Sequence, residues 1–420
     1  MPVYDLLLRN AYLHQRDAVV DVGVADGRIA KIGESLSGAA AETVDADGNL
    51  LAPGFADAHK HLDRALAATG ERRPVANDRP NTSPQYVSDL FDAYYHDLTV
   101  DELADRVAET LRMAVAAGTT HVRTHVTADT SVGTDTMEAV LRAATRLDGA
   151  LDLQVVPYAA GGYDDAVGET LVTRAIEMAA DRLDGQVLLG GSLGLLGGQP
   201  APSVDATIER WFRLATAADV DLDVHLTGRG AAGYYALDRL AAATRDEGYE
   251  DRVTVVHAWA LAHIPEWWLD GVLARLDRSG IGVTVCYNSL RPGMPIEQID
   301  RRTRLAHGTD NDQDFVYPHG NADPIEAAQI ASYKLIGDWH FDPDYRWSET
   351  NPALDLLWKT ITRGAAETMG IDGYGIKTGT PADLVLLDEP SPEWAIIRRA
   401  TRRKVWKAGR LVAEDGEFVG

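Results

Sequence analysis

The sequence predicts an α/β protein in which a (β/α)8 TIM barrel carries a small β-sandwich domain formed by both termini. Eight buried strand patterns alternate with amphipathic helix patterns over about 300 residues, which is typical of such a barrel. Both ends of the chain instead contain short strand and turn patterns. At 420 residues the chain is also long enough for more than one domain. We expect the sandwich to comprise residues 1–52 and 372–420, and the barrel to comprise residues 53–371.

The terminal segments are short apolar runs separated by turn residues. The first fifty residues predict strands at 4–8, 19–24 and 28–32, with an Asp-Gly hairpin signal between the last two. The last fifty residues predict a strand at 383–387 and a hairpin at 404–412. Strand-rich ends on either side of a different middle region indicate one β domain built from both.

The middle of the chain supplies the barrel elements. Its strand patterns lie at 54–59, 120–126, 151–158, 186–192, 220–225, 253–257, 281–286 and 305–310. Helix patterns fall between them, for example at 99–117, 137–147, 204–218 and 264–279. Because active sites of these barrels lie at the carboxyl ends of the strands, the polar residues that end each run are the functional candidates.

Five residues that can bind a metal or move a proton close four of these strand patterns. His59 and His61 end the first strand, and their spacing places both rings on one side of it. His225 ends the fifth strand, His257 the sixth and Asp310 the eighth. Each residue alone is more often a buried core residue or a helix cap. Together at strand ends they predict a divalent metal, zinc or iron, with an open position for a water of lowered pKa.

The charge and the cysteine content of the chain limit which kinds of binding partner and which cellular compartment are expected. The net charge of −24 argues against nucleic acid. The sequence has no run of eighteen apolar residues and no signal-peptide pattern, so we expect no membrane partner. Cys286 is the single cysteine, which excludes an intrachain disulfide and fits a reducing cytoplasm. We therefore expect a cytoplasmic protein with a small-molecule substrate, and we expect it to be a homo-oligomer.

Several motifs resemble one known family. The segment 53–61, PGFADAHKH, with the lone histidines and the Gly-Thr-Asp at 308–310, resembles the amidohydrolase superfamily. The segments 59–63 and 121–126 are most similar to its cytosine deaminase branch, which includes N-alkyl triazine amine hydrolases. The likeness extends to residues 379–385 and so covers almost the whole chain. The resemblance implies a metal-bearing barrel and a β-sandwich made from the two termini.

The resemblance also implies roles for the strand-end residues. It implies one metal ion, preferably zinc and alternatively iron, with the ligands His59, His61, His225 and Asp310. His257 corresponds to the histidine that lies beside the metal water and polarises the substrate. Asp310 is expected to accept the proton of that water and pass it to the leaving group.

The sequence departs from cytosine deaminases at two positions. These enzymes carry a glutamate three residues after the histidine that corresponds to His225, whereas this chain has Gly228. Their base-binding glutamine after the third strand also has no counterpart at 158–162. A glycine cannot transfer a proton, so cytosine itself is not the expected substrate.

Other side chains near the barrel top are candidates for substrate binding. Arg64 follows the first strand, where it can meet a carbonyl or carboxylate, and His125 ends the second strand. Trp259 can stack on a planar ring, although a tryptophan is more often a packing residue. Arg291 and Asp314 lie in loops after the seventh and eighth strands. The segment 70–98 is expected to form either a lid or a surface connection.

We therefore predict a mononuclear metal-dependent amidohydrolase or aminohydrolase. It would cleave a C–N bond of a small nitrogen heterocycle or cyclic amide with metal-activated water. One alternative is a hydrolase that releases an alkylamine from a substituted ring. A second alternative is a member of the fold that binds a metal and a ligand without turnover.

Overall fold

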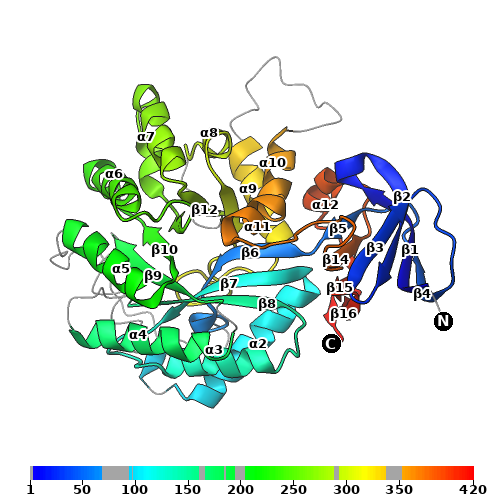
Figure 1. Cartoon of the computed structure of the whole chain (residues 1–420), viewed down its shortest axis with the longest axis horizontal. Coiled ribbons are helices and arrows are strands. Elements are labelled where there is room, and N and C mark those ends of the chain that lie inside the picture. Colours follow the sequence, from blue (N-terminus) through cyan, green and yellow to red (C-terminus); the bar gives the residue numbers. More distant parts are fainter. Residues whose placement is uncertain are drawn as a thin grey trace.

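The computed structural model describes residues 3–68, 94–96, 98–159, 166–183, 186–193, 204–287, 293–336 and 352–420. Parallel strands ringed by helices make up most of the molecule, and a smaller group of strands lies against one side of them (Figure 1). The α/β fold class and the terminal β domain are therefore confirmed. Within the described residues, no helix combines the length and the apolar character needed to cross a bilayer.

Within the described residues, eight strands in chain order form the barrel. They are β6 (Phe55–Lys60), β7 (Thr119–Thr127), β8 (Asp152–Tyr158), β9 (Leu188–Leu193), β10 (Asp221–Leu226), β11 (Val253–Val256), β12 (Gly282–Cys286) and β13 (Leu305–Gly308). Parallel pairing joins β6, β7 and β8 in that order into one sheet, and it joins β9, β10, β11, β12 and β13 in that order into another. Parallel bridges between Val155 and Val187 and between Lys60 and Asp310 link the two groups of strands. These bridges close the ring, which brings the first strand beside the eighth.

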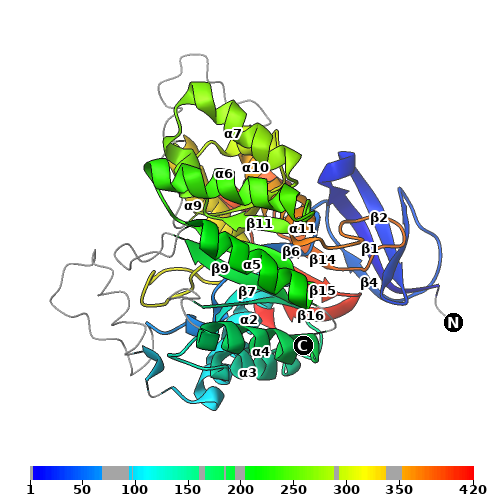
Figure 2. The ribbon, with the colours of Figure 1, turned by 60° about the vertical axis from the view of Figure 1, so that its left-hand side comes forward.

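Helices cover the outer surface of this ring (Figures 1 and 2). They are α2 (Val100–Ala116), α3 (Asp135–Thr145), α4 (Ala166–Ala180), α5 (Val204–Ala218), α6 (Gly230–Asp246), α7 (Glu266–Arg278), α8 (Ile296–Asp300), α9 (Pro324–Ile336), α10 (Pro352–Thr360) and α11 (Arg363–Met369). Apolar residues from these helices and from the strands form one continuous core. Thr99 and Glu102 make a capping box that fixes where α2 begins.

The terminal domain consists of two sheets. One sheet has the order β3-β2-β1-β4 and the other the order β17-β16-β15-β14-β5. Their strands are β1 (Tyr4–Leu13), β2 (Ala18–Ala25), β3 (Arg28–Gly33), β4 (Ala40–Asp45), β5 (Leu51–Pro53), β14 (Leu384–Leu387), β15 (Arg402–Lys407), β16 (Arg410–Glu414) and β17 (Glu417–Phe418). The helix α12 (Pro392–Arg398) follows β14. Leu8 and Val22 from one sheet and Leu384 and Trp406 from the other share a buried core, as in a sandwich.

The strand β5 connects the two parts of the molecule. Although it belongs to the N-terminal segment, it pairs antiparallel with β14 from the C-terminal segment. The chain then continues through Gly54 directly into the first barrel strand. The domain limits of 1–52 and 372–420 remain predictions.

Candidate metal centre

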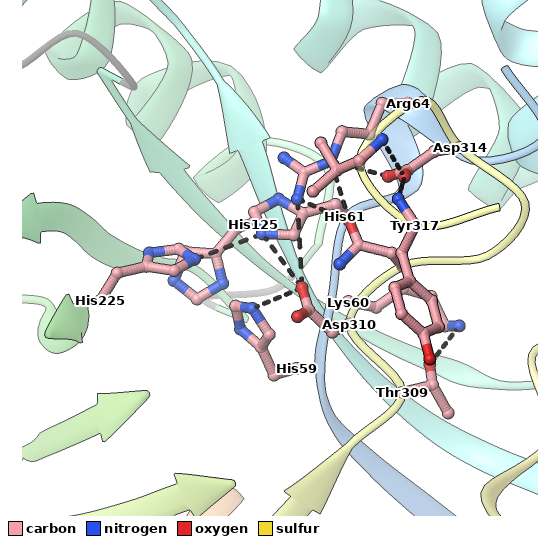
Figure 3. Close-up of polar contacts among 12 residues, drawn as sticks. His59, Lys60, His61, Arg64, His125, His225, Thr309, Asp310, Asp314 and Tyr317 are labelled. Carbon is pink, nitrogen blue, oxygen red and sulfur yellow. Dashed lines mark hydrogen bonds and ion pairs between the residues drawn. The ribbon is translucent and has the colours of Figure 1, made fainter. Parts of the chain in front are cut away.

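The structure brings the four expected metal ligands together at the carboxyl end of the barrel. His59 lies in β6, His61 follows this strand, His225 lies in β10 and Asp310 follows β13 (Figure 3). All four side chains are buried. The Asp310 Oδ1 atom lies 3.5 Å from Nε2 of His59 and 3.7 Å from Nε2 of His61. The Nε2 atoms of His61 and His225 are 3.2 Å apart.

Backbone contacts fix this arrangement. The Asp310 amide donates to the carbonyl oxygen of His59 over 2.9 Å, and the His61 amide donates to the carbonyl oxygen of Asp310 over 2.9 Å. At Gly308, an added Cβ atom would lie 2.4 Å from Cβ of His59. Glycine at this position therefore allows the first and eighth strands to approach closely.

Two strands end earlier than the sequence predicted. We expected strands through His257 and Asp310, but β11 ends at Val256 and β13 ends at Gly308. The φ angle is +69° at His257 and +66° at Asp310, in the left-handed region. This conformation is incompatible with a continuing strand. It turns both residues out of their strands at the end of the barrel.

The imidazoles of the centre are suited to bind a metal. Among the described residues, neither ring nitrogen of His59 has a hydrogen-bond partner, and Nδ1 of His61 has none either. Burial, followed by the positive charge of Arg64, holds the pKa of His61 well below its ordinary value. Burial and the neighbouring histidines do the same to the pKa of His225. These rings are therefore neutral near pH 7 and keep lone pairs for coordination.

The carboxylate of the centre is ionised. Burial alone would raise the pKa of Asp310, but the His59 and His257 imidazoles and the Arg64 guanidinium outweigh it and lower that pKa. Neutral imidazoles with one carboxylate form a donor set that zinc and other divalent transition metals accept. The residues present therefore fit the metal that the fold implies.

A buried ion cluster supports the centre from behind. The Lys60 ammonium donates to Oγ1 of Thr309 over 2.6 Å, lies 3.3 Å from Oδ2 of Asp57, and pairs with Asp312. Asp57 also accepts the Thr309 amide over 2.9 Å and the Thr309 hydroxyl over 2.7 Å. Burial would lower the pKa of Lys60, but the Asp312 and Asp57 carboxylates outweigh it and raise that pKa. The cluster thus fixes the residues on either side of Asp310.

Arg64 and Asp314 lie next to the expected ligands. Arg64 donates from Nη2 to Oδ1 of Asn311 and from Nε to Oδ2 of Asp314, both over 2.9 Å, and its Nη2 atom lies 4.0 Å from Oδ1 of Asp310 (Figure 3). Burial raises the pKa of Asp314 to about 6, although Arg64 and the Tyr317 amide oppose this. A guanidinium in this position can bind a carbonyl or carboxylate oxygen of a small molecule.

Of the other expected substrate-binding residues, the structure describes His125 and Trp259, which lie beside the histidines of the centre, and does not describe Arg291. The His125 side chain is buried. The centroid of its ring lies 4.5 Å from that of the His59 ring and 4.4 Å from that of the His225 ring. The Trp259 ring lies 5.4 Å from the His257 ring. Arg291 and most of the segment 70–98 fall outside the described residues. The substrate-binding roles of these residues remain predictions.

Two residues at this end of the barrel were missed. Tyr158 is buried at the end of β8, its ring lies 5.3 Å from the His225 ring, and burial raises its pKa to about 12. Cys286 ends β12, and its Sγ atom lies within 4.8 Å of ligating atoms of His59, His257 and Asp310. Both are the last residues of predicted strands. The position at a strand end, which made the histidines candidates, therefore also pointed to these two residues. Neither residue was included among the candidates for metal or substrate binding.

Comparisons with known proteins agree with this geometry. A model of the amidohydrolase family matches residues 82–413. The chain is 38% identical over 422 residues to the N-isopropylammelide isopropyl amidohydrolase of Pseudomonas sp. (strain ADP), and the match covers 99% of each chain. The crystal structure of N-isopropylammelide isopropylaminohydrolase from Burkholderia multivorans is similar with a TM-score of 0.85 and 28% identity, again over 99% of each chain. The structure of 5-methylcytosine deaminase from Klebsiella pneumoniae has a TM-score of 0.79 at 24% identity over 97% of each chain, which supports the fold alone.

Proposed function

The chain belongs to the amidohydrolase family, and on this premise we propose that it releases an alkylamine from a substituted triazine ring, with N-isopropylammelide as the substrate to test. Family membership confirms the resemblance noted in the sequence and makes the protein a hydrolase of C–N bonds other than peptide bonds. The observation that carries the proposal is the 38% identity, over 99% of both chains, to an enzyme named for this substrate. The proposed activity is the first of the two alternatives that the sequence left open.

The proposed reaction is a hydrolytic displacement on a ring carbon. The bond between that carbon and the amine nitrogen breaks, a bond to the water oxygen forms, and the products are a ring hydroxyl and the free amine. A divalent ion held by His59, His61, His225 and Asp310 would supply a water of lowered pKa as the nucleophile. Asp310 would accept a proton from the attacking water and return it to the leaving nitrogen. His257 stabilises the negative charge that develops on the ring.

The residue at position 228 supports amine release over cytosine deamination. An added Cβ at Gly228 would lie 3.2 Å from Cα of Gly233, and one at Gly233 would lie 2.3 Å from the Gly228 carbonyl oxygen. The start of α6 therefore packs closely against this position, which offers no side chain to move a proton. The proton for the leaving group must come from another residue, and Asp310 is the proposed source.

Arg64 is the proposed contact for a ring oxygen of the substrate. Its Nη2 atom is 4.0 Å from Oδ1 of Asp310, so a group that it binds lies close to the reacting carbon. Asn311 and Asp314 hold its guanidinium plane in place.

We propose zinc as the ion, since imidazole and carboxylate donors suit it, with iron as the alternative. The cytoplasmic location and the homo-oligomer remain predictions.

The test measures isopropylamine released from N-isopropylammelide by the purified holoenzyme, with cytosine as the comparison substrate. We expect amine release that stops after treatment with a chelator and returns with zinc, together with little or no ammonia from cytosine. Ammonia from cytosine without amine release would overturn the proposal. A metal-loaded protein that hydrolyses neither compound, nor a wider panel of triazines and cyclic amides, would favour the non-catalytic alternative.

A further inference from the structure

Cys286 belongs to the carboxyl end of the barrel, although the proposed reaction does not use it. It is the last residue of β12 and is 2% exposed. Its partner across the sheet is Gly308 in β13, two residues before Asp310. On the other side of β12, the His257 amide donates to the carbonyl oxygen of Thr284 over 2.8 Å. Strand register therefore places Cys286 between the residues that precede Asp310 and the turn that carries His257.

This placement creates a second set of metal donors. The ligating atoms of His59, His257, Cys286 and Asp310 all lie within 4.8 Å of one another, and all four residues are buried. Within the described part of the chain, both ring nitrogens of His59 are without a hydrogen-bond partner. Ligand atoms around tetrahedral zinc are roughly 3.3–3.8 Å apart, so small side-chain movements would close the set around an ion. Two imidazoles, one thiolate and one carboxylate are ligands that zinc accepts.

We propose that His59, His257, Cys286 and Asp310 form a second metal position, which takes a thiophilic divalent ion such as zinc or cadmium. It shares His59 and Asp310 with the first set and replaces His61 and His225 by His257 and Cys286. As the bond between sulfur and the metal forms, the thiol proton leaves to solvent, because the thiolate is the ligand. The inference rests on the metal centre of the proposed function, since the two positions share ligands.

An ion in the second position has a functional consequence. It would occupy His257 and Asp310, which the proposed reaction needs for charge stabilisation and proton transfer. Enzyme loaded with thiophilic cadmium is therefore expected to release isopropylamine more slowly than enzyme loaded with zinc, and Cys286→Ser is expected to reduce that difference.

Cobalt provides a direct test, because a thiolate bound to Co²⁺ gives a charge-transfer band in the near ultraviolet. Cys286 is the single cysteine of the chain, so any such band is assigned to it. Metal-free protein is titrated with Co²⁺ and separately with Cd²⁺, while bound metal is counted by elemental analysis. We expect the band in the wild-type protein and its loss in Cys286→Ser, which still binds cobalt through the first set. Cys286→Ala serves as a second variant that removes the sulfur without adding a hydroxyl.

The outcomes separate this inference from the proposed function. Bound cobalt and bound cadmium without a charge-transfer band in the wild-type protein would overturn the second position and leave amine release untouched. A protein that takes up neither ion would overturn both the second position and the metal centre. A band with no hydrolysis of any triazine would support the second position and contradict the proposed function.

Discussion

The backbone amide of Asp310 donates a hydrogen bond to the carbonyl oxygen of His59 over 2.9 Å. This contact joins the first and last barrel strands between two of the expected metal ligands. Barrel closure and assembly of the metal centre therefore depend on the same residues. Changes at this seam should affect stability and metal binding together.

The buried ammonium of Lys60 is expected to be essential for stability. Lys60→Met would leave Asp57 and Asp312 as uncompensated buried charges, and we expect a loss of about 3–5 kcal/mol in the free energy of unfolding. Urea denaturation measures this. Lys31→Met on the exposed side of β3 is the matched control and should change stability by less than about 0.5 kcal/mol. Equal stabilities of the two variants would contradict a supporting role for the cluster.

Metal removal should destabilise the folded protein, because the ligands converge only when the barrel is closed. An ion present at a thousand times its Kd adds about 4 kcal/mol to the free energy of unfolding. Thermal denaturation of holoprotein and chelator-treated protein measures the difference. In His225→Ala we expect that difference to shrink strongly. A Tm that does not respond to the chelator, in a protein shown to lose its metal, would argue against the ligand set.

Asp314 predicts a pH dependence of stability. Its pKa rises from the model-peptide value of 3.8 to about 6 in the folded protein, mainly through burial. The folded state therefore binds the proton more tightly than the unfolded state, and stability falls as pH rises from about 4 to about 6. For this group alone the slope reaches about 1.4 kcal/mol per pH unit.

Asp314→Asn should remove this slope, whereas Asp415→Asn at an exposed position should keep it. Urea denaturation between pH 4 and pH 7 compares the two variants with the wild-type protein. Protonation of Asp314 at low pH also weakens the ion pair that holds the Arg64 guanidinium in place. The KM for the triazine should therefore change between pH 4 and pH 7 in the wild-type protein and not in Asp314→Asn. Identical pH profiles for all three proteins would contradict the assignment.

Two glycines give opposite expectations. An added Cβ at Gly228 would crowd Gly233, so Gly228→Ala should lose about 1–3 kcal/mol. At Gly271 in α7 the nearest atom to an added Cβ is 3.9 Å away, so Gly271→Ala should gain about 0.5–1 kcal/mol from helix propensity. Guanidinium denaturation compares both with the wild type. Stabilisation by Gly228→Ala would show that α6 does not constrain the position.

Sequence patterns predicted the barrel and the strand-end histidines because buried strands and amphipathic helices leave strong periodic signals. Val204–Ala218 was predicted to the residue as α5, since its apolar positions repeat with helical spacing. The left-handed turns at His257 and Asp310 were not predicted, because they depend on hydrogen bonds to neighbouring strands.

Two further side chains, Lys60 and Cys286, have surroundings that arise from contacts between segments far apart in the sequence. Lys60 pairs with Asp312, which is 252 residues away in the chain, and no local pattern encodes this. Cys286 had the right position at a strand end, but its closeness to His59 follows from the closed ring and the register of β12. The order of strands and the residue types at their ends therefore selected the candidate ligands, whereas groups such as Lys60 and Cys286, whose roles depend on tertiary contacts, were missed.

The most direct measurement compares isopropylamine release from N-isopropylammelide by the wild-type protein and by Asp310→Asn, per metal ion bound. The asparagine keeps the size of the side chain and removes its ability to accept a proton. We expect turnover by the wild type and a kcat lower by about 10²–10⁴-fold in the variant, the range that general acid–base catalysis contributes. Equal turnover by the two proteins would contradict the account.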